Sequence, residues 1–333
     1  MKFDICTFGS ITLDLFIESD EVSVIDQKFV FPVGDKIGID KMHKFIGGGA
    51  ANSAVGFRRT GLETAVFGIL GTDFEAKFIE KKLEEEKIET KFLSKTKNTD
   101  SSFSVVLMSE DGRRTIFHHR STQRDFGVEI LKKIPETRAV YISHLYDQTQ
   151  SFLKSLPELK KRNIKIAWNP GKTQFKAGFR TFEKVFPVID VLILNVEEAE
   201  LFTGLKASKI NEFDQNVLGE KVAFGKESVN NNFSDVREIA QKFLQAGVKE
   251  VVITDGGDGA HIFDEKNHFF APAPDVPREC TLGAGDAFSV GVVTAFLANK
   301  DLQTQVKWGT MNASSVIQKF GAQNGLLTRF NEQ

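Results

Sequence analysis

The stretch Glu279-Cys-Thr-Leu-Gly-Ala-Gly-Asp-Ala-Phe-Ser-Val-Gly291 places two glycines and a carboxylate at the start of an apolar run. That run, Ala287–Leu297, predicts a buried helix. Gly283 and Gly285 let the backbone turn and leave room for a bulky anion. The first N–H groups of a helix have no intrahelical partner and carry partial positive charge, so they can bind a phosphate without a basic side chain.

The carboxylate of this stretch, Asp286, lies where a substrate hydroxyl would meet that phosphate. Backbone donors for a transferring group and a carboxylate for the hydroxyl proton are the two parts that phosphoryl transfer needs. The alternative is that Asp286 only caps the helix after a glycine-rich turn, which is a common arrangement. The helix by itself leaves both interpretations open.

A second glycine-rich stretch, Gly47-Gly-Gly-Ala-Ala-Asn-Ser-Ala-Val55, runs into a predicted helix at Ala50–Arg58. Together with Leu282-Gly-Ala-Gly-Asp-Ala-Phe288, in this order, it resembles the two signatures of the ribokinase-like (PfkB-type) carbohydrate kinases. The similarity extends from Gly9 to about Gly325. It implies an α/β fold, a ribokinase-like three-layer sandwich with a mostly parallel central sheet and a small β-sheet lid. It also implies ATP-dependent transfer of the γ-phosphate to a hydroxyl of a sugar or sugar-like substrate.

The composition fits this class. The chain has 333 residues, of which 41% are hydrophobic and 26% charged, with a net charge of −2. This balance gives no general attraction to nucleic acid or to anionic membranes, and no apolar run approaches the length of a membrane span. Two cysteines, Cys6 and Cys280, form neither a disulfide framework nor a metal cluster, which suits a reducing compartment. We therefore expect a cytoplasmic protein with no nucleic-acid or membrane partner.

Apolar runs alternate with helical patterns along most of the chain. We expect strands at Phe3–Phe8, Thr64–Leu70, Ala139–Ser143, Ile164–Trp168, Val191–Leu194 and Glu250–Thr254, and helices from about 73 to 86 and at Gln150–Lys161. Lys206–Phe233 is polar and asparagine-rich, and it is long for a connection in a compact domain. We read it as an exposed insertion at about 206–233, of unknown role.

Two segments on either side of the second glycine signature have the pattern of strands and turns. They are Phe16–Phe45 and Ser102–His118, the latter a predicted hairpin around residues 110–112. The resemblance implies that they form the lid, inserted at about 16–45 and 102–118 into a single ribokinase-like domain spanning 1–333. If the outer apolar residues of the lid pair across a two-fold axis, a homodimer follows.

Basic side chains follow the predicted hairpin. His118 and His119 would point to opposite faces of a strand, which argues against a shared metal site. Arg120 or Arg124 could reach a phosphate across the cleft, although basic residues on exposed strands are usually only solvated.

The resemblance assigns the reacting groups and the acceptor contacts. Asp286 would be the base that activates the sugar hydroxyl, and the backbone of Gly283, Ala284 and Gly285 would form the anion hole. The sugar contacts would be Asp14, Gly48, Gly49 and Asn52. Asp14 follows the carboxyl end of the first strand, where ligands of such sheets bind, but it could equally cap a turn. True ribokinases tend to carry a lysine at the position of Gly49, which argues against ribose.

The nucleotide contacts are implied in the same way. The glycine-rich loop with Thr254, Gly256 and Gly259 would run along the nucleotide phosphates, and Asn312 would lie near adenine. Asn195 and Glu198 match a motif that organises hydrated Mg²⁺ and phosphate. Mg²⁺ keeps several waters and needs few protein oxygens, so two polar residues suffice. The alternative for this pair is a helix N-cap with an acidic first turn.

One departure from the family pattern concerns a monovalent cation. The family usually has an aspartate six residues before the catalytic one, tied to a monovalent-cation site, and this chain has Cys280 there. A neutral thiol is a poor potassium ligand, so potassium dependence is in doubt. The expected cofactors are therefore ATP and Mg²⁺.

Three alternatives differ in function. A nucleoside (adenosine-like) kinase of the same family fits the same motifs. A non-catalytic ligand-binding protein on the kinase fold would also retain the motifs, and the change at Cys280 keeps that alternative open. A nicotinamide dehydrogenase is set aside, because it needs Gly-x-Gly-x-x-Gly after the first strand where this chain has Gly9-Ser-Ile-Thr-Leu-Asp14.

Overall fold

The computed structural model describes residues 2–97, 99–109, 113–120, 126–145, 150–210, 212, 214–222 and 233–330. Its largest sheet has the strand order β15-β19-β18-β17-β13-β12-β11-β1-β6. Neighbours from β6 to β17 pair in parallel, and only β18 runs antiparallel to both of its neighbours. The strands are β1 Lys2–Phe8, β6 Thr64–Phe67, β11 Glu136–Ile142, β12 Lys165–Trp168, β13 Val191–Asn195, β15 Glu220–Lys221, β17 Glu250–Thr254, β18 Gly259–Phe263 and β19 His268–Pro272. The mostly parallel sheet expected from the sequence is confirmed.

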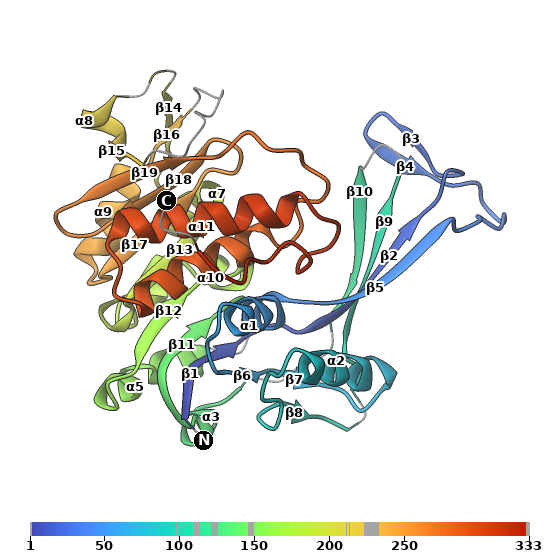
Figure 1. Cartoon of the computed structure of the whole chain (residues 1–333), viewed down its shortest axis with the longest axis horizontal. Helices are drawn as coiled ribbons and strands as arrows, with labels where there is room; N and C mark the ends of the chain where they lie inside the picture. Colours follow the sequence, from blue (N-terminus) through green and yellow to red (C-terminus); the bar gives the residue numbers. More distant parts are fainter. Residues whose placement is uncertain are drawn as a thin grey trace.

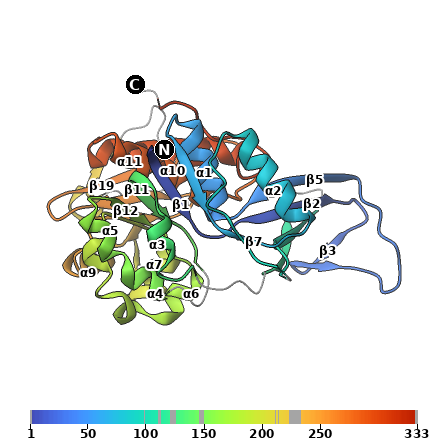
Figure 2. The same ribbon diagram turned by 90° about the horizontal axis from the view of Figure 1, so that it is seen from below.

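Helices cover both faces of this sheet, so that the body has three layers (Figure 2). One face carries α1 Gly49–Arg59, α10 Ala284–Leu297 and α11 Leu302–Ile317. The other carries α4 Gln150–Ser155, α5 Pro157–Lys161, α6 Lys172–Ala177, α7 Val196–Thr203 and α9 Arg237–Gln245. Short helices α3 Ile130–Lys133 and α8 Gln215–Leu218 and two 3-10 turns, Phe179–Phe182 and Phe186–Val188, complete the body.

Phenylalanine dominates the core on the α7 and α9 face. Phe186, Phe202 and Phe243 are each at most 2% exposed, and their ring centroids lie 5.5–5.9 Å apart. Trp168 at the end of β12 packs edge-on against Phe202 of this group, at 6.2 Å. Each large side chain buried this way contributes about 1.5–3 kcal/mol by leaving water. The packing fixes the carboxyl ends of the central strands, where the candidate site lies.

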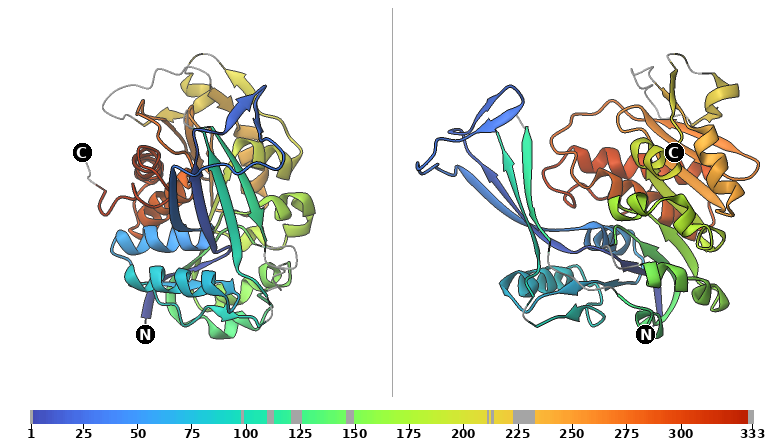
Figure 3. Two further views of the ribbon diagram at one scale, coloured as in Figure 1. Left: turned by 90° about the vertical axis from the view of Figure 1, so that its right-hand side faces the viewer. Right: turned by 180° about the vertical axis from the view of Figure 1, so that it is seen from behind.

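A separate four-stranded sheet stands off the body (Figures 1 and 3). Its order is β10-β9-β2-β5, with β2 Thr12–Glu18, β5 Lys41–Gly47, β9 Ser102–Met108 and β10 Arg114–His119. The hairpin of β3 Ser23–Ile25 and β4 Lys28–Val30 extends beyond its tip. At the base of this sheet Phe16, Phe45 and Val106 pack against Leu282 and Phe320 of the body. Both segments expected to form a lid contribute strands to this sheet.

Two predicted elements are wrong in detail because a single residue interrupts each. The strand expected over Thr64–Leu70 divides at Gly68 into β6 and β7 Ile69–Leu70, and β7 pairs instead with β8 Ser94–Lys95. Gly68 lies so close to Ile11 that a β-carbon there would overlap its side chain. The helix expected over Gln150–Lys161 is two helices, because Pro157 lacks an N–H and begins α5 as its first residue. Helix α2 Phe74–Glu85 agrees with the helix expected from about 73 to 86.

The segment at 206–233 is only partly described. β14 Ser208–Ile210 pairs with β16 Phe233–Asp235, and β15 joins the edge of the large sheet. Leu218 and Phe233 are buried, so this segment has apolar anchors that its polar composition does not indicate. Residues 211, 213 and 223–232 lie outside the described residues, as does the expected turn at 110–112. Across the part of the chain that is described, no helix has the length and apolarity to cross a membrane.

Candidate active site

Two clefts open at the carboxyl ends of the parallel strands and meet at the start of α10. The Thr254 cleft has a cavity volume of about 210 Å³. It is lined by Thr254, Gly256, Gly257, Gly259, Ala260, Ala273, Pro274, Arg278, Thr281, Ala284, Gly285, Phe288, Thr310, Ala313, Ser314 and Ile317. The Asp14 cleft has a cavity volume of about 480 Å³. It is lined by Ser10, Thr12, Asp14, Gly48, Asn52, Ser104, Val106, Ile116, His118, Arg120, His144, Leu282, Gly283 and Asp286.

The first residues of α10 separate the two clefts. Gly283 is the N-cap, with φ +80°, a left-handed conformation that glycine adopts without strain. A β-carbon at Gly283 would lie 2.5 Å from Cβ of Ala322, so no larger residue fits. Outside Gly285 the space is open, because a β-carbon there would meet nothing within 4 Å. Unpaired N–H groups of the first turn therefore face room for an anion at the junction of the clefts.

Asp286 lies in the first turn of α10 and faces the Asp14 cleft. Nδ2 of Asn52 donates to its Oδ2 at 2.8 Å, and Nε2 of Gln323 donates to Oδ1 of Asn52 at 2.8 Å. Burial raises the pKa of Asp286 above the usual aspartate range, and the charge of Asp14 adds to this, while the bond from Asn52 opposes it.

Asn52 lines the Asp14 cleft, where the sequence placed a sugar contact, and it also has two protein partners. Both ends of its amide are occupied by protein partners, and it orients Asp286 from α1. Gln323, which also donates to the carbonyl of Ile46, holds Asn52 in turn. Gln323 could not be predicted from the sequence, because it lies in an irregular segment beyond α11 and belongs to neither glycine signature.

Asp14 lies inside β2, opposite Ser104 of β9, and does not cap a turn. It is 8% exposed, and Oγ1 of Thr12 donates to its Oδ1 at 3.0 Å. Burial raises the pKa of Asp14, against hydrogen bonds from Thr12 and Ser104. Gly47 passes so near that a β-carbon on it would overlap Oδ2 of Asp14.

The start of α1 approaches the same point. Gly48, the N-cap of α1, has φ +86° and lines the Asp14 cleft. A β-carbon at Gly49 would lie 2.7 Å from Cβ of Ser143 and 3.4 Å from Oδ1 of Asp286. The glycine signature thus lets the backbone of α1 come within contact distance of Asp286.

The far wall of the Asp14 cleft is basic. His118 and Arg120 line it from β10 and the residues that follow. Nδ1 of His118 lies 2.9 Å from Oγ of Ser104, and burial together with the charges of Arg120 and His119 lowers the pKa of His118. Arg120 makes no ion pair with any described residue. Arg124, the other arginine considered from sequence, lies outside the described residues.

Asn195 and Glu198 form a capping box at the start of α7. Oδ1 of Asn195 accepts from N of Glu198 at 2.7 Å, and Oε2 of Glu198 accepts from N of Asn195 at 3.0 Å. This is the N-cap arrangement considered from the sequence. The pKa of Glu198 is raised by burial and by the charges of Glu197 and Asp286, which places Glu198 within electrostatic range of the α10 start.

A magnesium ion would find few protein ligands here. Among the described residues there is no group of three acidic, histidine or cysteine side chains that could hold a metal. Glu198 uses Oε2 for the capping bond, while Oε1 has no protein partner in the described part of the chain. One carboxylate oxygen fits a magnesium ion that retains most of its waters and binds phosphates.

The loop between β17 and β18 lines the Thr254 cleft. Thr254 stands opposite Asn195 in the parallel register of β17 and β13. Gly256 has φ +55°, and a β-carbon at Gly259 would overlap the carbonyl of Ala271. Gly259 is thus required by the packing, and the two glycines leave few side-chain atoms between the loop backbone and the cleft.

Asn312 is not in either cleft, so its assignment near adenine is corrected. It is fully buried in α11, where Nδ2 donates to the carbonyl of Ala287 at 2.7 Å and Oδ1 accepts from N of Leu327 at 2.9 Å. Its neighbours Thr310, Ala313 and Ser314 line the Thr254 cleft instead. Helical periodicity turns position 312 away from the cleft. The sequence therefore indicated the right helix but the wrong face of it.

Comparisons with known proteins identify a family that spans most of the chain. The family described as pfkB family carbohydrate kinase matches residues 2–329. The chain is 24% identical to an ATP-dependent 6-phosphofructokinase of Thermoanaerobacterium thermosaccharolyticum, over 96% of this chain and 90% of the relative. It is 23% identical to a ribokinase of Staphylococcus aureus, over 97% and 96% of the two chains.

Solved structures share the fold. The Arabidopsis thaliana ribokinase complexed with ribose and ATP matches with a TM-score of 0.74 at 18% identity, covering 97% of this chain and 95% of that one. A Burkholderia thailandensis nucleoside kinase in complex with inosine matches with a TM-score of 0.70 at 18% identity, covering 97% and 94%.

Proposed function

The chain belongs to the pfkB family of carbohydrate kinases, and we propose that it transfers the γ-phosphate of ATP to a hydroxyl of a sugar or sugar-like acceptor. The observation that carries this proposal is the meeting of two clefts at the start of α10. The Thr254 cleft would hold the nucleotide and the Asp14 cleft the acceptor. Asp286 and the N–H groups of Gly283, Ala284 and Gly285 stand between them.

The reaction follows from that placement. An acceptor hydroxyl oxygen attacks the γ-phosphorus in line, the bond from that phosphorus to the bridging oxygen breaks, and ADP leaves. Asp286 accepts the hydroxyl proton as the new bond forms, and Asn52 keeps its carboxylate turned to the acceptor. The N–H groups of Gly283–Gly285 donate to the phosphoryl oxygens as charge develops. Mg²⁺, held near Glu198 through its waters, supplies charge neutralisation for the phosphates when bound.

The acceptor is argued from the walls of the Asp14 cleft. The buried carboxylate of Asp14 accepts hydrogen bonds from hydroxyls and suits a polyol. On the far wall, the guanidinium of Arg120 favours an acceptor that also carries an anionic group, a carboxylate or a phosphate. By their names, the ribokinase among the relatives acts on a sugar without an anionic group, and the 6-phosphofructokinase acts on a sugar that carries a phosphate.

A nucleoside is the second candidate acceptor. Val106, Ile116 and Leu282 give the Asp14 cleft an apolar side that could contact a base. The solved nucleoside kinase with bound inosine has the same fold. A non-catalytic binding protein is the weaker alternative, because Asp286 is held by a dedicated hydrogen-bond chain through Asn52 and Gln323.

The four-stranded sheet would act as the lid over the acceptor. Its inner face supplies Asp14, Ser104 and His118 to the Asp14 cleft, so the acceptor is bound by the lid and by the body together. Its outer face exposes Met42 and Phe117, which are 54% and 57% exposed. Burial of these side chains against a second copy of the chain would form the homodimer suggested by the sequence.

We expect potassium to change the rate by no more than about twofold at constant ionic strength. The position six residues before Asp286 carries Cys280, which is 2% exposed and gives no carboxylate for a monovalent cation. Initial rates in potassium and in tetramethylammonium chloride measure the effect. Cys280→Asp should increase the response, and Cys280→Ser is the neutral control. A strong potassium requirement in the unmodified protein would contradict the expectation.

The proposed function is tested by ADP release from ATP and Mg²⁺ with a panel of acceptors. The panel contains neutral sugars, sugar acids, sugar phosphates and nucleosides. We expect one of the first three classes to raise ADP release well above the acceptor-free rate. Turnover confined to nucleosides would move the assignment to the second candidate. Binding of panel members without any turnover would favour the non-catalytic alternative.

A further inference from the structure

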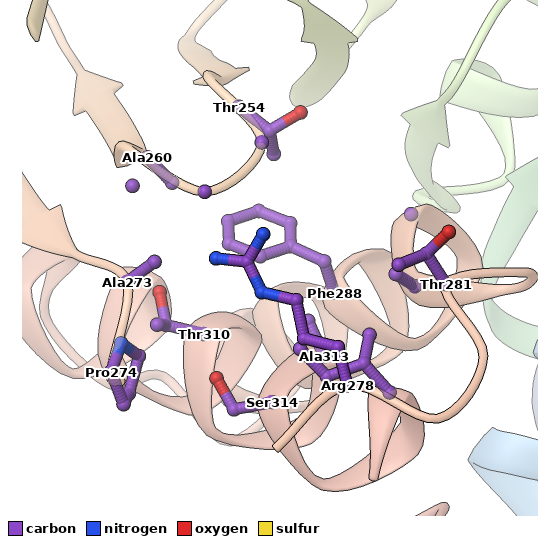
Figure 4. A pocket seen from close by; sticks show the side chains of 16 residues that line it. Thr254, Ala260, Ala273, Pro274, Arg278, Thr281, Phe288, Thr310, Ala313 and Ser314 are labelled. Atoms are coloured by element: carbon purple, nitrogen blue, oxygen red, sulfur yellow. The ribbon is translucent and has the colours of Figure 1, made fainter. Parts of the chain in front are cut away.

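The Thr254 cleft contains one charged side chain, and neither the glycine signatures nor the proposed mechanism uses it. Arg278 enters the cleft from the segment that precedes α10, and Figure 4 shows its guanidinium in the middle of the cleft. A β-carbon at Gly257 would lie 2.9 Å from Nη2 of Arg278 and 3.3 Å from Nη1. The guanidinium thus lies against the β17–β18 loop at Gly257.

Within the described part of the chain, no carboxylate that lines the cleft balances the charge of this guanidinium. None of the residues that line the Thr254 cleft carries a carboxylate. Arg278 makes no ion pair with any described residue. A guanidinium remains protonated at every physiological pH. The counter-charge in the cleft must therefore come from solvent ions or from the ligand.

The position of Arg278 along the cleft indicates which part of a ligand it meets. In Figure 4 Ala273, Pro274 and Thr310 lie on one side of the guanidinium, and Thr281 lies on the other, toward the start of α10. The first side is mostly apolar and suits a base, and the second leads to the open N–H groups at Gly285. When the base lies on the first side and the terminal phosphate of the nucleotide reaches Gly285, the other phosphates lie next to Arg278.

We propose that Arg278 is a nucleotide-binding residue that holds the polyphosphate of a nucleoside di- or triphosphate through two parallel N–H···O bonds. This inference rests on the proposed function for the orientation of the nucleotide. The planar fork of a guanidinium matches two phosphate oxygens, and such charge-assisted bonds are about twice as strong as neutral ones. Arg278 thereby adds a fixed positive charge beside an anion hole that is otherwise built from backbone N–H groups and Mg²⁺.

The test is a set of equilibrium dissociation constants for ATP, ADP and adenosine, measured with Mg²⁺ and without acceptor. In Arg278→Met we expect the Kd of ATP and of ADP to rise about ten- to a hundredfold, and that of adenosine to change by less than about twofold. Arg278→Lys keeps the charge but loses the planar guanidinium. Its Kd for ATP and for ADP should lie between those of the parent and of Arg278→Met. Arg329→Met removes an exposed arginine that lines neither cleft and is the matched control.

Two outcomes overturn the inference. An ATP Kd that Arg278→Met leaves within about twofold of the parent shows that Arg278 does not bind the phosphates. If Arg278→Met weakens adenosine binding by the same factor as ATP binding, Arg278 stacks on the base instead. Because no acceptor is present, the result is independent of turnover. A parent that binds ATP through Arg278 but phosphorylates no acceptor overturns only the proposed function, whereas a parent that binds no nucleotide overturns both.

Discussion

Asp286→Asn should lower kcat by at least ~10² while the affinity for ATP stays within a few-fold of the parent. Asparagine keeps the shape of the side chain and its contact with Asn52 but cannot accept the hydroxyl proton. Asp286 faces the Asp14 cleft and does not line the Thr254 cleft, so nucleotide binding should not depend on it. Steady-state rates with the best acceptor of the panel, together with an ATP binding titration, measure the two effects.

The same residue sets the pH dependence. Asp286 works as a base only when ionised, and its pKa is raised by burial. Activity should therefore be retained above this raised pKa and fall as the pH drops through it, at a higher pH than for an ordinary aspartate near 3.9. Asp275→Asn, at an exposed position outside both clefts, is the control and should leave rate and profile unchanged. Turnover of Asp286→Asn within a few-fold of the parent would show that the base lies elsewhere.

Asp14→Ala should lower kcat/KM by about 10²–10³, mainly through KM for the acceptor. The carboxylate of Asp14 is buried in the Asp14 cleft. When the acceptor binds, its hydroxyls would replace water as hydrogen-bond donors to this carboxylate. Its partners Thr12 and Ser104 already satisfy part of its hydrogen-bonding capacity, so the remaining lone pairs point to the acceptor. The kcat/KM of Asp14→Asn should lie between the values of the parent and of Asp14→Ala.

The measurement compares KM for the acceptor and for ATP in the same variants. KM for ATP should change little, because Asp14 does not line the Thr254 cleft. Asp35→Ala removes an exposed carboxylate from the same inserted segment and serves as the control. An unchanged acceptor KM in Asp14→Ala would place the acceptor outside the Asp14 cleft.

The parts of the fold that the sequence predicted are those with a local physical cause. The buried strands and α10 follow from apolar runs of the right length, and the turn at Gly283 follows from a glycine that the structure holds at φ +80°. The failures have equally local causes, at Gly68 and Pro157, where one residue interrupts an apolar pattern. Periodicity averages over several residues and cannot place such a break.

The site could be predicted as a set of motifs but not as a network. Asp14 and Asp286 lie in one cleft, as the resemblance implied. That Asn52 would be committed to Asp286 and Gln323 depends on the packing of α1 against α10 and on an irregular segment. Arg278 was missed for a similar reason, since a single arginine in a polar segment has no pattern until the cleft around it is known.

The most direct test of the central claim is a crystal structure with Mg²⁺, a non-hydrolysable ATP analogue and the acceptor that the panel identifies. The account predicts the terminal phosphate at the start of α10, within hydrogen-bond distance of N–H groups of Gly283–Gly285. It also predicts an acceptor hydroxyl between that phosphate and the carboxylate of Asp286. A terminal phosphate bound away from α10, or an acceptor whose reacting hydroxyl faces another group than Asp286, would contradict it.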